Sequence, residues 1–136
     1  MKIASTLFCL LTLCFSCAHP GKLTGDYQGN SVRFGKSGGF TNIPMEYVLH
    51  DDRHVYEIVA DSTIFVNRIS RKQMKDIEEL LDSVDFKNLK MTETGNMTYF
   101  MHAKFKSWEN KVQWTDISEN EQLKNIYKKL LSTIND

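Results

Sequence analysis

Apolar and polar residues alternate along one stretch of this sequence with little interruption. Met97, Tyr99, Met101, Ala103 and Phe105 occupy every second position, and mostly polar residues stand between them. Successive side chains of a β-strand point to opposite faces of a sheet, so this pattern predicts a strand with one buried face. Shorter runs rich in β-branched and aromatic residues predict further strands near 32–34, 43–49, 55–59, 63–69 and 112–114.

Two other segments carry the helical period. The first contains Met74, Ile77, Leu80, Leu81 and Val84, and the second contains Leu123, Ile126, Tyr127, Leu130, Leu131 and Ile134. A capping box at Ser70–Gln73 precedes the first segment, and a similar pattern at Ser118–Glu121 precedes the second. The predicted order is ββββ-α-ββ-α. This order indicates an α+β fold in which two amphipathic helices cover one face of an antiparallel sheet.

The first residues predict export. Lys2 gives a basic start, a mainly apolar run follows to Phe15, and none of the three cysteines lies beyond Cys17. Secretory signals have this layout, and the run is shorter than the roughly 20 apolar residues that a bilayer span requires. We expect residues 1–16 to be a signal peptide, residues 17–30 a flexible glycine-containing tether, and residues 31–136 a single α+β domain.

The residues around Cys17 resemble a bacterial lipobox, in which a small residue such as Ser16 precedes the cysteine that receives lipid. The resemblance implies a protein anchored in the cell membrane or outer membrane through lipid on Cys17. The sequence Ala18–Gly21 favours the periplasmic side. A lone cysteine suits this role, because exported cysteines otherwise tend to pair. Cys14 and Phe15 depart from the usual lipobox, so plain secretion after cleavage behind Ala18 is the alternative.

Charge and motifs exclude several function classes. The chain has 17 basic and 17 acidic residues and a net charge of zero, with no basic stripe, so no nucleic-acid partner is expected. His50–His54 gathers potential ligands, but neighbours in a tight turn point apart, so we predict no metal and no cofactor. No nucleophile stands out, and the chain is not expected to be an enzyme. The alternative is a small hydrolase or metal-dependent enzyme that uses His50, Asp52, His54 or His102.

We predict instead a binding or accessory module of the cell envelope that contacts a protein, peptide or glycan. Its specific version is an inhibitor of an envelope-degrading enzyme, and a purely structural envelope component is a further possibility. Function concentrates on loops held by a rigid scaffold. The expected contacts are therefore two turns and one loop tryptophan, which comprise Lys36, Ser37, Asp51, Asp52, Arg53, His54 and Trp108.

Several turn and aromatic residues carry a resemblance to a known group. They are Phe34–Gly35, Gly38–Thr41, Gly95–Met97 with Tyr99–Phe100, and Trp114. In these features the chain resembles small uncharacterised lipoproteins of Bacteroidota-type bacteria, over roughly residues 31–131. In that group a glycine-rich turn leads into a strand, and a later Gly-Asn turn opens an aromatic strand. The resemblance implies a shared fold and brings no activity with it.

Overall fold

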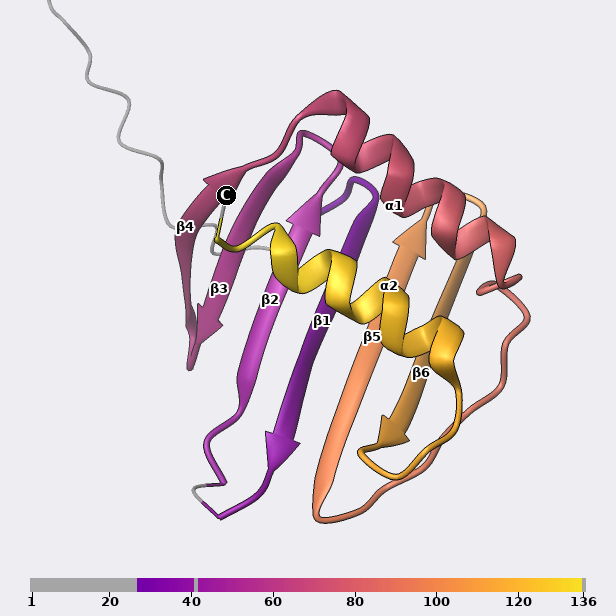
Figure 1. Cartoon of the computed structure of the whole chain (residues 1–136). Coiled ribbons are helices and arrows are strands. Elements are labelled where there is room, and N and C mark those ends of the chain that lie inside the picture. The colour runs from indigo at the N-terminus through magenta and orange to yellow at the C-terminus, as the bar shows by residue number, and fades with distance from the viewer. Residues whose placement is uncertain (1–26, 41, 136) are drawn as a thin grey trace, which may run out of the picture.

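The computed structural model of this chain describes residues 27–40 and 42–135. The predicted signal peptide, Cys17 and most of the predicted tether lie outside the described residues. The elements follow the predicted order along the chain (Figure 1). They are β1 (Ser31–Gly38), β2 (Met45–His50), β3 (His54–Val59), β4 (Ser62–Arg68), α1 (Arg71–Ser83), β5 (Met97–Phe105), β6 (Trp108–Thr115) and α2 (Glu121–Ser132).

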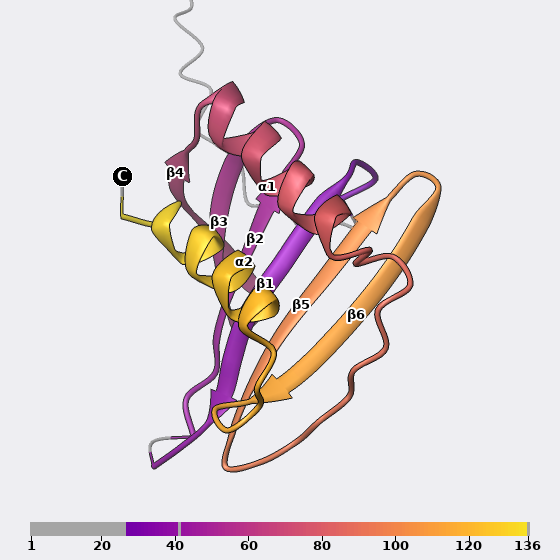
Figure 2. The same ribbon diagram turned by 45° about the vertical axis from the view of Figure 1, so that its right-hand side comes forward.

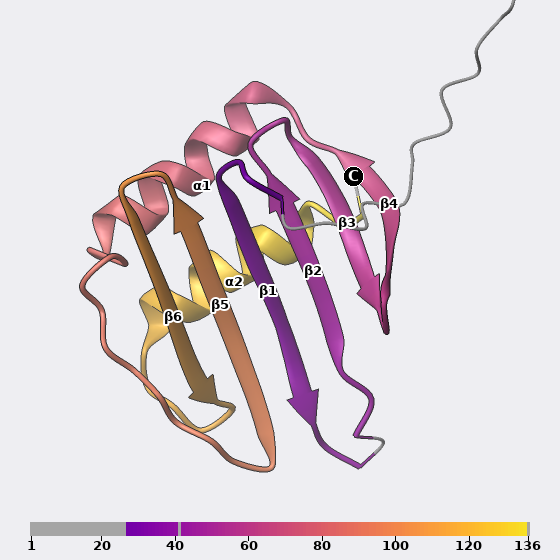
Figure 3. The same cartoon turned by 180° about the vertical axis from the view of Figure 1, so that it is seen from behind.

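The six strands form one antiparallel sheet in the order β4-β3-β2-β1-β5-β6. Both helices lie on the same face of this sheet, as the two views of Figures 1 and 2 show. Among the described residues, no helix lies on the opposite face (Figure 3). The predicted α+β fold is confirmed. No helix in residues 27–40 and 42–135 has the length and apolar character needed to cross a membrane.

The core lies between the helices and the covered face of the sheet. Its largest fully buried side chains are Trp114, Phe34 and Phe86. Tyr127 of α2 meets the Trp114 ring edge to face, with 5.5 Å between the ring centres, and Tyr99 stacks on Trp114 at 5.8 Å while also contacting Tyr127 at 5.4 Å. Aromatic pairs at such distances add about 0.5–1.5 kcal/mol each beyond the area they bury. This cluster joins β5, β6 and α2.

The first helix begins as predicted and the second does not. Ser70 accepts a hydrogen bond from the Gln73 N–H while the Gln73 side chain accepts one from the Ser70 N–H, which completes the capping box. The predicted box at Ser118 is wrong. Asn120 is the N-cap of α2 and accepts from the Leu123 N–H at 3.0 Å. Ser118 lies two residues too early, where its hydroxyl accepts from the Thr115 N–H.

The predicted turn at 35–39 is also wrong in its position. Lys36 and Ser37 belong to β1, which continues to Gly38, so neither residue lies on a loop. Gly35 permits this because β2 runs unusually close to it, and a Cβ there would stand 2.1 Å from the Met45 carbonyl oxygen. The chain turns only at Gly38 and Gly39, whose φ angles of 95° and 75° favour glycine.

Trp108 is not an exposed loop residue as predicted. The β5–β6 turn falls at Lys106 and Ser107, and Trp108 is the first residue of β6. Its ring stacks on Phe105 with 4.6 Å between ring centres and contacts Phe86, so it is partly buried against the core. Trp108 therefore contributes part of its ring to the core of the domain.

Two adjacent leucines of α1 test the one-sided packing. Leu81 is 1% exposed and Leu80 is only partly buried. We expect Leu81→Ala to lower the free energy of unfolding by about 2–5 kcal/mol, because it leaves a cavity in a closed core. Leu80→Ala, as the matched control, should lower it clearly less. Urea unfolding of both variants measures the difference, and equal losses would contradict the assigned helix face.

Candidate functional site

Side chains on the uncovered face lie in rows across neighbouring strands. Ser31 of β1 pairs with His50 of β2 on one side and with Lys104 of β5 on the other. In the next row Arg33 lies between Val48 and His102. Adjacent side chains in such rows stand about 4.5–5.5 Å apart at Cβ. Ser31 has a short side chain between longer neighbours, and it lines a hollow of about 300 Å³ on this face. The hollow is also lined by Tyr27, Ile58, Thr63 and Glu109.

Tyr27 forms one wall of this hollow. Its ring stacks on the His50 imidazole, with 3.7 Å between ring centres and an interplanar angle of 1°. Its hydroxyl donates to an Asp51 carboxylate oxygen, and the Asn30 N–H donates to the other oxygen at 3.0 Å. Residues 27–30, which the sequence assigned to the tether, are therefore attached to the domain beside the β2–β3 turn.

His50 is the most unusual polar residue of the site. It is 4% exposed, and its Nδ1 atom has no hydrogen-bond partner within the described part of the chain. Burial lowers the pKa of His50, although the Asp52 and Asp51 carboxylates act in the opposite direction. The imidazole is therefore neutral near pH 7, with one nitrogen as donor and the other as acceptor. A buried ring nitrogen without a partner carries an unfavourable desolvation energy, which a bound donor or acceptor relieves.

The β2–β3 turn next to the hollow is built as predicted. Asp51, Asp52 and Arg53 form the turn and His54 opens β3. The Asp52 carboxylate accepts from the His54 N–H at 3.0 Å and pairs with His54 Nδ1 at 2.9 Å. Burial alone would raise the pKa of Asp52, but these hydrogen bonds outweigh it and hold that pKa below its ordinary value. Arg53 takes a positive φ of 73°.

The other charges of the face are mostly paired. The Arg33 guanidinium binds the Glu46 carboxylate, with Nε 2.8 Å from the oxygen. His102 Nε2 lies 2.7 Å from Glu109 Oε1. Lys104 stands opposite Glu109 in the strand register, yet it forms no ion pair with any described residue. The hollow thus holds an unpaired ammonium group, which suits a carboxylate ligand.

The structure brings only part of the predicted contact set together. Asp51, Asp52 and Arg53 form the β2–β3 turn and His54 follows it, and Asp51 binds Tyr27 in the wall of the hollow. Lys36 and Ser37 lie further along β1, and Trp108 packs against the core. Asp52 pairs with His54, and His50 and His102 both line the hollow, but residues 27–40 and 42–135 contain no group of three or more His, Cys, Asp or Glu placed to hold a metal. Tyr27, Ser31, Arg33 and Lys104 also line the hollow, although they were not predicted from the sequence. The alternation of side chains along β1 and β5 would have placed Ser31, Arg33 and Lys104 on the uncovered face.

Comparisons with known proteins leave the family open. No protein-family model matches this chain, and no curated protein matches it.

The buried His50 makes stability depend on pH. Its pKa lies below 6.5 in the folded protein and near 6.5 in the unfolded chain, so below that pH the unfolded chain binds more protons. The free energy of unfolding should therefore fall as pH drops from about 7.5 to 5. His50→Phe keeps a flat ring against Tyr27 and should reduce this slope. His102→Gln, which replaces a half-buried histidine paired with Glu109, is the control. Urea unfolding across this pH range measures it, and equal slopes for wild type and His50→Phe would refute the assignment.

Proposed function

We propose that the protein is a lipid-anchored binding module of the cell envelope that takes a carboxylate group of a peptide or glycan into the hollow of the uncovered sheet face. The observation that carries the ligand-binding part is the hollow itself, which His50 and Lys104 line in one row with Ser31. Among the described residues, His50 Nδ1 has no hydrogen-bond partner and Lys104 has no ion pair. The anchor and the envelope location rest on the export signal and the lipobox-like residues before Cys17.

The chemistry of the hollow supports a ligand with a charged head and a small apolar body. Lys104 and the neutral His50 offer donors to carboxylate oxygens, and the Ser31 hydroxyl offers another. Val48 and Ile58 supply an apolar surface in the same hollow. The Glu109 carboxylate, which also lines the hollow, is hydrogen-bonded to His102 on the neighbouring strand. Charged hydrogen bonds of this kind contribute about 1.5–3 kcal/mol each.

Two probes distinguish the possible sources of the carboxylate. The purified protein is titrated with N-acetylalanine, a model of a peptide terminus, and with glucuronate, a model of an acidic sugar, while amide shifts are followed by NMR. N-acetylalanine amide is the neutral control. We expect shifts around residues 31, 50 and 104 with at least one acid. Lys104→Ala should weaken that binding about tenfold, since one charged contact is lost.

Lys106→Ala is the matched variant, because Lys106 lies in the turn of the same hairpin and is exposed. It should leave the affinity unchanged. Binding of the neutral amide as strongly as the acid, or no binding of either acid, would refute a carboxylate site.

The anchor is tested by the intact mass of the protein extracted from membranes. We expect a chain that begins at Cys17 and carries several acyl groups, since one chain alone holds a protein to a membrane only weakly. Cys17→Ser should remove that added mass and release the protein to the soluble fraction. An unmodified chain that begins at His19 would instead establish plain secretion.

A further inference from the structure

Large apolar side chains are exposed at the end of the sheet that lies away from Tyr27. In the loop between β1 and β2, Phe40 is fully exposed and Ile43 is 68% exposed, and Met45 at the start of β2 is 38% exposed. Ile117, between β6 and α2, is 86% exposed. We call these four residues the loop end.

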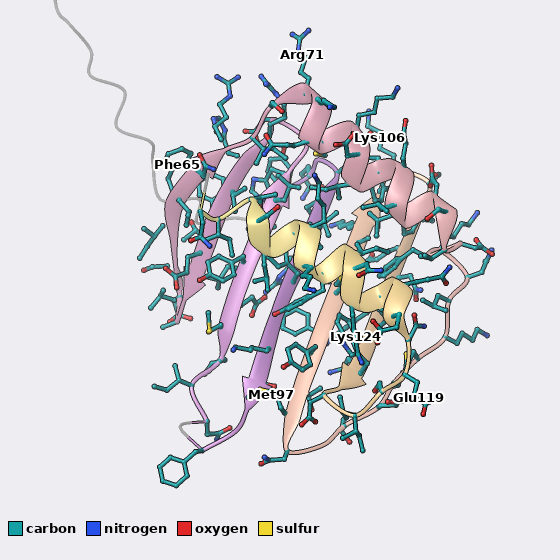
Figure 4. All side chains as sticks on the ribbon, in the orientation of Figure 1. Phe65, Arg71, Met97, Lys106, Glu119 and Lys124 are labelled. Atoms are coloured by element: carbon teal, nitrogen blue, oxygen red, sulfur yellow. The ribbon has the colours of Figure 1, made fainter. Side chains whose placement is uncertain are left out.

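The segments that carry the loop end are held close together. The strand register places Gly38 beside Met97 and Thr98 beside Thr115. The β1–β2 loop, the segment before β5 and the β6–α2 loop therefore lie at the same end of the strands. The Gly39 N–H donates to the Asn96 carbonyl oxygen at 2.7 Å, which ties the first segment to the second. In Figure 4, Met97 and Glu119 lie at this end, while Arg71 and Lys106 lie at the opposite one.

The charges around the loop end are predominantly negative. Asp116 and Glu119 flank Ile117 and form no ion pair with any described residue. Glu93 also lies here and accepts a hydrogen bond from the Ser118 hydroxyl, which leaves its charge uncompensated. One basic residue, Lys36 of β1, pairs with Met45 in the strand register.

These charges discriminate between possible occupants. An anionic bilayer would be repelled by the carboxylates. A second copy joined loop end to loop end would bring like charges together. A basic surface would be attracted, and charges that flank an apolar contact strongly influence partner choice.

We propose that the loop end is a docking surface for a protein that offers an apolar pocket bordered by lysine or arginine side chains. Phe40 enters that pocket, because aromatic side chains at the centre of an interface contribute most to affinity. Asp116 and Glu119 meet the basic border. This surface is separate from the hollow at His50 and does not depend on the ligand proposed for it.

Site-specific photo-crosslinking in intact cells tests this proposal in the full chain. A benzophenone amino acid replaces Phe40 in one variant and Phe65 in another. Phe65 is the matched control, since it is also an exposed phenylalanine, 45% accessible, but lies on β4. We expect a discrete protein adduct from position 40 and none from position 65.

Charge reversal then tests the carboxylates. Asp116→Lys with Glu119→Lys should reduce the adduct from position 40 at least about tenfold, while Glu78→Lys with Asp82→Lys on α1 changes the net charge equally and should leave it intact. Circular dichroism verifies that both double variants are folded. The adduct should also survive Lys104→Ala, which separates this surface from the hollow.

The partner, identified by mass spectrometry, should be a basic protein. Its purified form should bind the wild-type chain about tenfold more weakly at 300 mM than at 50 mM salt, because screening weakens contacts between exposed charges. The proposal is overturned if no adduct forms, if both positions crosslink equally, if the adduct is a lipid or a second copy, or if charge reversal has no effect.

Discussion

The contact between α2 and the covered face of the sheet determines what the rest of the molecule can present. Trp114, Tyr99 and Tyr127 form one aromatic cluster there, and α1 fills the remaining covered area with Ile77 and Leu81. Both helices have a single apolar stripe, and both use it on the same face. No helix within residues 27–40 and 42–135 covers the other face of the six strands, so side chains on that face, such as His102 and Lys104 of β5, must suit water or a ligand.

The uncovered face meets that requirement mainly by pairing charges within the sheet. Arg33 holds Glu46 across β1 and β2, and His102 holds Glu109 across β5 and β6. These contacts are partly exposed, so each contributes little to stability, typically below about 1 kcal/mol. Their effect is positional, since they keep long side chains away from Ser31. The hollow thus lies over the short Ser31, while the longer Arg33 and Glu109 side chains are held by Glu46 and His102.

Periodicity was sufficient to predict the fold, because strand and helix patterns in this chain are strong and agree with the capping at Ser70. It failed where a contact distant in sequence decides the local structure. Gly35 and Gly38 suggest a turn when considered alone, but pairing with β2 and β5 extends β1 through both. Trp108 follows a polar turn, yet Phe86 and Phe105 bury part of it. Tyr27 stands among glycines, and only the tertiary structure places it on His50.

The Tyr27–His50 stack belongs to only one of the two surfaces. Tyr27 is the first described residue, and it stacks on His50 in the wall of the hollow. A ligand that reaches the His50 ring must accommodate or displace Tyr27, so occupancy of the hollow and the Tyr27–His50 stack are linked. The loop end has no contact with Tyr27 and lies at the opposite end of β1. A partner bound there would leave the Tyr27 stack undisturbed, so it would not compete with a ligand in the hollow.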